Sequence, residues 1–102
     1  MSVPVVWLPQ AEATLDAILD HVERESPRGA LSLALAIRQG ANILLADHPK
    51  AGRVGRRRGT RELVIAGTPV VIVYRLREKP LRVEILRVLH GKQQWPPLER
   101  VP

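Results

Sequence analysis

The spacing of apolar residues changes about halfway along the chain, and this change limits the folds that the chain can adopt. From Gln10 to Ala46, apolar residues recur at the three- and four-residue spacing of amphipathic helices. After Gly59 they gather in short runs rich in Val, Ile and Leu, which is typical of strands. A chain of 102 residues fits one domain. We therefore expect helices on one face of a sheet, since so short a chain is not expected to cover both faces.

The first half predicts a short strand followed by two helices. Val3 to Leu8 is an apolar run that ends at a proline, and it reads as the strand. Ser26 and Pro27 then separate the helices, because serine caps a helix and proline suits its first turn. So short a joint predicts an antiparallel helical hairpin. The apolar stripe of the first helix consists of Ala11, Leu15, Ile18, Leu19 and Val22, and that of the second of Leu31, Ala34, Leu35, Arg38, Ala41 and Leu45.

The second half predicts three strands, over 61–66, 70–76 and 81–89, with turns at 67–69 and 78–80. Alternation fails after Ile85, which indicates a β-bulge or a partly wet face. The fold class is therefore α+β, in the order β-α-α-β-β-β. An antiparallel helical hairpin covers one face of a three- to four-stranded, mainly antiparallel sheet. Residues 1–102 form one domain, and its tail, 96–102, is expected to be irregular.

Charge is divided unevenly along the chain. Residues 1–47 hold three Lys or Arg against six Asp or Glu, whereas residues 48–102 hold thirteen against four. A positive potential over one face attracts nucleic acid or acidic protein segments. The alternative is a soluble surface that is basic without a partner.

Several classes of site are not expected. The absence of cysteine excludes disulfides, thiolate metal sites and a cysteine nucleophile. No phosphate-binding loop, dinucleotide fingerprint or metalloprotease motif occurs, and His21, His48 and His90 lie far apart, so neither a metal nor a cofactor is predicted. There is no signal-peptide pattern and no apolar run near membrane-spanning length. We expect a cytoplasmic protein without a membrane partner.

Two segments carry candidate binding or catalytic residues. The first is a loop interrupted by glycines that carries five arginines. A guanidinium group binds phosphate or carboxylate bidentately, through two parallel hydrogen bonds. The arginines are Arg53, Arg56, Arg57, Arg58 and Arg61. A solvated connecting loop is the alternative. The second segment runs from Arg87 to Pro96; it brings His90 and Lys92 to the sheet rim, and Trp95 follows in the tail. His90 has the chemistry of a general acid or base, or it fixes the strand end; Trp95 covers core or anchors an interface.

These segments, in this order, resemble the RelE/ParE superfamily of bacterial toxins from toxin–antitoxin pairs. The resemblance rests on the helical hairpin, the helix end at 45–49 followed by Gly52-Arg53, and the strand opening Arg61-Glu62-Leu63. It continues through the central strand 70–74 and the segment 85–95 with its His-Gly-basic-Gln ending. The resemblance implies a toxin neutralised by an antitoxin that lays an amphipathic or acidic segment along the domain in a hetero-oligomer.

The family has two branches with different targets. RelE-like members cleave messenger RNA in the ribosome and rely on an arginine in the central strand, whereas ParE-like members bind DNA gyrase. Here the central strand has no arginine before Arg75. The resemblance therefore favours the ParE-like branch, with the basic loop, His90, Lys92 and Trp95 as target-binding residues. The alternatives are a ribonuclease using His90, Arg61, Arg87 and Lys92, and a non-toxic basic interaction module. All three expect these cations to converge on one side of the sheet.

Overall fold

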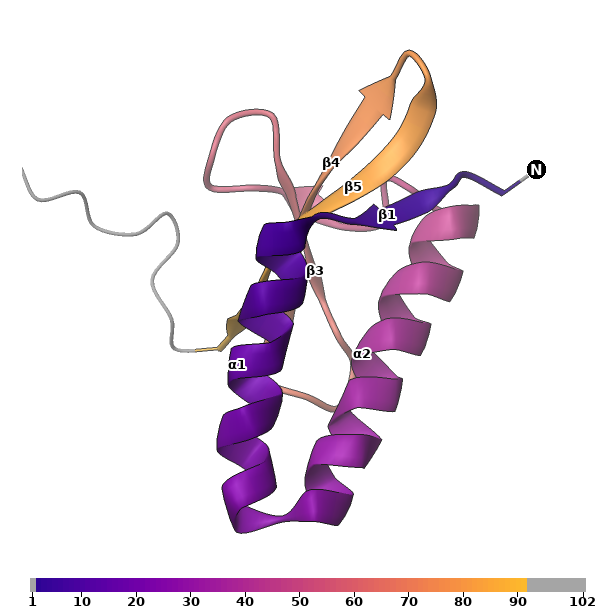
Figure 1. The fold of residues 1–102 in the computed structure, drawn as a ribbon. Helices are drawn as coiled ribbons and strands as arrows, with labels where there is room; N and C mark the ends of the chain where they lie inside the picture. Colours follow the sequence, from indigo (N-terminus) through magenta and orange to yellow (C-terminus); the bar gives the residue numbers. More distant parts are fainter. Residues whose placement is uncertain (1, 92–102) are drawn as a thin grey trace, which may run out of the picture.

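The computed structural model describes residues 2–91, which form a helical hairpin and one sheet (Figure 1). The elements follow in the order β1 (Val5–Trp7), α1 (Pro9–Glu25), α2 (Pro27–Asp47), β2 (Arg53–Val54), β3 (Arg61–Val64), β4 (Val70–Glu78) and β5 (Leu81–His90). The predicted α+β class and element order are confirmed. The sheet has one more strand than expected, because Arg53 and Val54 of the basic loop pair with Glu62 and Arg61 of β3.

The helices form where the sequence signals placed them. Pro9 and Pro27 each occupy the first turn of a helix, and the Ser26 hydroxyl accepts a hydrogen bond from the Gly29 N–H at 2.9 Å, which caps α2. Both helices bury one side against the sheet. Of the expected α2 stripe, however, Leu31 and Leu35 are 64% and 51% exposed, so part of the helix's apolar surface faces solvent.

The strands lie in the order β1-β5-β4-β3-β2, with β1 parallel to β5 and the other neighbours antiparallel. The predicted bulge is present. Tyr74 pairs with Ile85 and Val73 pairs with Arg87, so Leu86 of β5 has no partner on β4. Because side chains alternate along a strand, this extra residue moves every later β5 side chain to the opposite face from the one that unbroken alternation would give.

The two faces of the sheet have different surroundings. One face packs against the helices through Ile72, Tyr74 and Val83, together with Ala11, Leu15 and Ile18 of α1 and Ile37, Ala41 and Leu45 of α2. We call the opposite side the open face, because neither helix covers it. It carries a small apolar cluster around Val73 and Leu89, with charged residues beside it.

Helix α2 is the one helix in the part of the chain described whose length and composition would suit a membrane span. The sequence expectation of no such run missed it, because polar residues interrupt the apolar ones. Ile37, Ala41 and Leu45 are buried in the core, and Arg38 binds Glu12 of α1 through two hydrogen bonds of 2.6 and 2.7 Å. These contacts join one side of α2 to the rest of the folded domain.

Candidate binding site on the open face of the sheet

Strand register collects arginines on the open face. Arg75 and Arg77 project there from β4, since Tyr74 and Leu76 point to the helices. Their partners on β5 are Glu84 and Arg82. The row nearer the middle of the sheet runs across four strands and consists of Arg53, Glu62, Val73 and Arg87. We call the set Arg53, Arg56, Arg75, Arg77, Arg82 and Arg87 the arginine stripe.

Glu62 organises one end of the stripe. Its side chain is fully buried, and its carboxylate accepts hydrogen bonds from Arg53 at 3.2 Å and from the backbone and side chain of Arg56 at 2.8 and 3.2 Å. Burial by itself raises the pKa of Glu62, but the bonds from Arg56 and Arg53 outweigh it and hold the pKa below its ordinary value. The carboxylate therefore stays charged and fixes two of the predicted loop arginines in place.

Glu84 organises the other end. Arg75 donates to it at 2.6 Å and Arg82 at 2.8 Å, while the Nε of Arg77 lies 3.6 Å away. The hydrogen bond from Arg75 lowers the pKa of Glu84, with burial opposing it and Arg82 adding to it. One carboxylate thus holds two guanidinium groups directly and neutralises only part of the charge of three.

Arg61 and the remaining loop arginines lie elsewhere. Arg61 pairs with Tyr74, so it projects to the helix side, where it donates to the carbonyl oxygen of Gly52 at 2.8 Å. Arg57 and Arg58 are exposed at the tip of the loop, beyond the strands.

The buried Tyr74 hydroxyl accepts a hydrogen bond from the Gly52 N–H at 2.9 Å and donates one to the Pro49 carbonyl at 2.8 Å. Burial raises the pKa of Tyr74, and both hydroxyl bonds serve to hold the loop.

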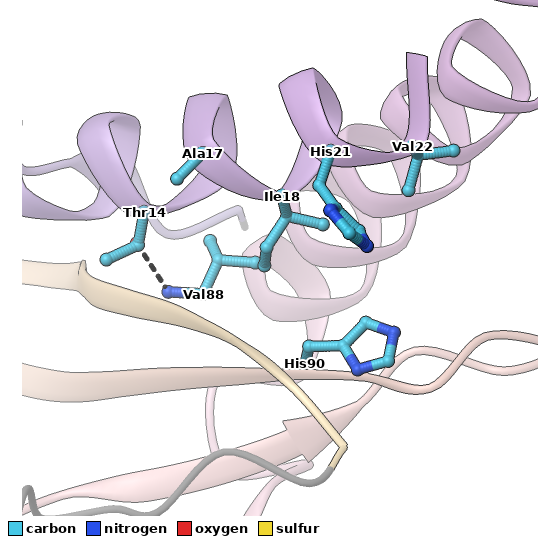
Figure 2. A pocket seen from close by; sticks show the side chains of 7 residues that line it. All are labelled: Thr14, Ala17, Ile18, His21, Val22, Val88 and His90. Carbon is cyan, nitrogen blue, oxygen red and sulfur yellow. Dashed lines mark hydrogen bonds between the residues drawn. The ribbon is translucent and has the colours of Figure 1, made fainter. Parts of the chain in front are cut away.

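His90 also lies on the helix side. It pairs with Val70 after the bulge and lines a pocket of about 270 Å³ between β5 and α1. Figure 2 shows His90 on the β5 side of this pocket and His21 on the α1 side, with the hydroxyl of Thr14 bound to the Val88 N–H at 2.9 Å. The sheet therefore lies between His90 and the arginine stripe.

The expected convergence is therefore only partial. Arg53, Arg56 and Arg87 lie on the open face, Arg61 and His90 lie on the opposite side, and Lys92 and Trp95 fall outside the residues described. On the open face, within residues 2–91, neither a histidine nor a tyrosine accompanies the arginines. The same part of the chain holds no cluster of three His, Cys, Asp or Glu residues suited to a metal ion. The arrangement is suited to binding anions.

A second surface is apolar. Helix α2 exposes Leu31, Leu35 and Ile43, the last at 65%. Beside Ile43, a groove of about 450 Å³ separates α2 from β3 and the turn that follows it, and Leu44, Leu63 and Ile65 also line this groove. We call it the α2–β3 groove. Exposed apolar side chains next to a groove are typical of a surface that another protein covers.

The family model described as the ParE toxin of the type II toxin–antitoxin system parDE matches residues 5–95. The chain belongs to this toxin family. Y4kP of Sinorhizobium fredii is 40% identical over 90 residues, covering 88% of this chain and 90% of its own. Toxin RelE2 of Caulobacter vibrioides is 37% identical over 87 residues, covering 85% and 93%.

Two solved structures share the fold of this chain. The chromosomal ParDE toxin–antitoxin system of P. aeruginosa matches with a TM-score of 0.76 and 29% identity, over 89% of this chain and 98% of that one. The RelBE2 toxin–antitoxin complex of Mycobacterium tuberculosis shares the fold, with a TM-score of 0.59 and 23% identity over 88% and 99%. The expected RelE/ParE resemblance is confirmed, and the protein is a toxin of a type II toxin–antitoxin system.

In this ParE toxin, sequence reasoning found one end of the stripe and missed the other. Arg75, Arg77, Arg82 and Glu84 were not among the candidates, although Arg and Glu alternate with apolar residues on both strands of the hairpin. Matching those alternations across the turn at 78–80 would have placed all four on one face. Continuous loop charge was easier to see than charge spread over two paired strands.

Proposed function

We propose that this ParE-family toxin is cytoplasmic, arrests growth by binding DNA gyrase rather than by cutting RNA, and is neutralised by a cognate antitoxin. The observation that carries the proposal is the separation of the ribonuclease candidates. Arg87 is on the open face, whereas Arg61 and His90 are on the helix side, with the sheet between them.

Cleavage of RNA by attack of a 2′-oxygen needs a proton acceptor and positive charge at the same phosphate. On the open face, among the residues described, the carboxylates of Glu62 and Glu84 are already held by arginines. The pKa values of both are lowered, so neither is suited to take a proton near neutral pH. The face supports binding better than acid–base catalysis.

Two assays on the purified full chain test the target. Supercoiling by DNA gyrase should fall at stoichiometric toxin, while messenger RNA in a translating extract should stay intact. Cleavage within translated codons without any effect on gyrase would instead establish the RelE-like ribonuclease. This alternative is considered because one relative of the chain is named toxin RelE2. Normal growth of a bacterial host containing soluble toxin would leave the non-toxic interaction module.

For the antitoxin, we propose two contact surfaces on this chain. Apolar side chains of the antitoxin enter the α2–β3 groove beside Ile43, where covering exposed apolar area is favourable. An acidic segment lies along the arginine stripe, whose charge is only partly offset by Glu62 and Glu84. The resulting hetero-oligomer buries both surfaces.

Salt separates these two contributions. Charge contacts weaken as ions screen them, with a Debye length of about 10 Å at 0.1 M. Affinity for the antitoxin should therefore fall between low and high salt, as measured by titration calorimetry. An affinity that does not change with salt would assign the binding energy to the groove alone.

A further inference from the structure

The outer half of the β4–β5 hairpin is a two-stranded ribbon that carries arginines on one side. Strand β3 pairs with β4 only as far as Tyr74, and β1 pairs with β5 only over Val83–Ile85. Beyond these pairs, β4 and β5 have only each other, through Arg77 with Arg82 and Glu78 with Leu81. Figure 1 shows this hairpin, in orange, extending past the helices.

The guanidinium groups on this ribbon are held in place and yet remain accessible. The side chains of Arg75, Arg77 and Arg82 are 40%, 53% and 37% exposed, while the Glu84 that gathers them is 4% exposed. A partner that binds these groups has less side-chain freedom to remove than it would with unconstrained arginines. The charge that Glu84 does not offset faces outward.

The stripe continues from the ribbon into the sheet. Along β4, Arg77 is four residues from Val73, a distance of about 13 Å along an extended strand. The row of Val73 leads across β3 to Arg53, beside Arg56. Six arginines therefore face the same way with two glutamates among them. Such a stripe matches the repeated negative charge of a nucleic-acid backbone.

The positions of the aromatic residues in the part of the chain described indicate which form of nucleic acid fits the stripe. Proteins that bind single strands stack unpaired bases on aromatic rings. Within residues 2–91 the aromatic residues are Trp7 and Tyr74, and both pack on the helix side. The open face of this part of the chain therefore offers cations to phosphates and no platform for bases. That combination suits a duplex, whose bases stay paired and whose major groove admits a two-stranded ribbon.

We propose that the arginine stripe binds the phosphates of duplex DNA, so that the toxin contacts the DNA on which gyrase acts as well as the enzyme. The inference rests on the proposed gyrase function. It takes duplex DNA, and not RNA, as the ligand because gyrase acts on duplex DNA. Binding through phosphates alone is independent of sequence, with a dissociation constant of about 10⁻⁴ to 10⁻⁶ M at physiological salt.

The test is the fluorescence anisotropy of a labelled duplex, titrated with the full chain in the absence of gyrase at several salt concentrations. Each phosphate contact contributes about −0.9 to the slope of log K against log salt. Arg77→Gln removes one contact and leaves Glu84 held by Arg75 and Arg82. It should weaken binding roughly eight-fold at about 0.1 M salt and reduce the slope by about one, and Arg53→Gln should do the same.

Two further variants make the result specific. Arg28→Gln, at the exposed start of α2, removes the same charge far from the stripe and should bind as the unchanged chain does. Glu78→Gln removes an exposed negative charge from the helix side of the same ribbon, opposite the arginines, and should tighten binding by much less than Arg77→Gln weakens it. Salt-independent binding, equal losses for Arg28→Gln and Arg77→Gln, or tighter binding of single-stranded RNA than of the duplex would overturn the inference.

The outcome also separates this inference from the proposed function. Inhibition of gyrase without binding to free duplex would discard the DNA contact and keep the gyrase target. Salt-dependent duplex binding without any effect on gyrase would do the reverse.

Discussion

Arg87 and His90 are three residues apart on β5, and their side chains lie on opposite faces of the sheet. Arg87 shares a row with Val73 on the open face, while His90 shares one with Val70 and borders the pocket against α1. The sheet thus keeps the imidazole of His90 away from the arginine stripe. This separation leads to the first prediction.

Replacing His90 by alanine should leave growth arrest unchanged, because its imidazole does not reach the open face. The measurement is the growth of a bacterial host after induction of each toxin, with equal soluble protein confirmed. The double variant Arg53→Gln, Arg77→Gln provides the comparison and should relieve arrest. Relief by His90→Ala, with the fold intact, would favour the ribonuclease.

Acid should destabilise this domain through its paired carboxylates. The folded pKa values of Glu12, Glu62 and Glu84 lie below the ordinary value of 4.5. Their ion pairs therefore contribute stability above that pH, and the contribution is lost as the pH falls through the folded values. Urea unfolding from pH 7 to pH 3 should show a falling free energy of unfolding. Glu84→Gln should flatten this fall, and a slope equal to that of the unchanged chain would show that Glu84 contributes nothing.

Tyr74→Phe should destabilise the fold by about 1–3 kcal/mol, since it leaves the Gly52 N–H and the Pro49 carbonyl without the hydroxyl that joins them. Urea unfolding measures the loss. Ser32→Ala, which removes an exposed hydroxyl from α2, is the control and should change stability by less than about 0.5 kcal/mol. A Tyr74→Phe protein as stable as the unchanged chain would mean that water replaces the hydroxyl.

Ile43→Glu should weaken antitoxin binding at least about ten-fold, because it places a charge beside the α2–β3 groove where an apolar partner is expected. Folding should be retained, since Ile43 is already 65% exposed. Ala13→Glu, on the exposed side of α1, adds the same charge away from the groove. Equal affinity for the two variants in a calorimetric titration would move the antitoxin to another surface.

Much of the fold followed from the sequence because its signals are local. Proline at the start of each helix, serine between the helices and glycine at the 67–69 turn each act on their own neighbours. Strand β2 was missed because two residues carry no periodicity, and its pairing depends on the distant β3. The exposed leucines of α2 were misread for a related reason: a helical stripe does not say whether this chain or a partner covers it.

The candidate site was harder to predict because it depends on register. Glu62 and Glu84 are buried charges, and their role in holding the stripe can be recognised only when their arginine partners are known. Arg56 and Arg75, two of these partners, come from the loop and from the other strand of the hairpin. The failed alternation after Ile85 did indicate a bulge. Its effect on His90 could not be read from the sequence, because the position and number of the extra residues decide which way the strand end faces.

The unpartnered Leu86 has a consequence for how chains on this scaffold are compared. Deleting that one residue would restore simple alternation, turn the imidazole of His90 toward the cations and turn the guanidinium of Arg87 toward the helices. A gain or loss in length, with no change of residue type, would then convert a surface suited only to binding anions into one that also has a proton carrier beside the arginines. Members of such a family that share identical residues here can therefore differ in chemistry. A sequence alignment of this strand must first pair residues that face the same side of the sheet, and only then compare residue types.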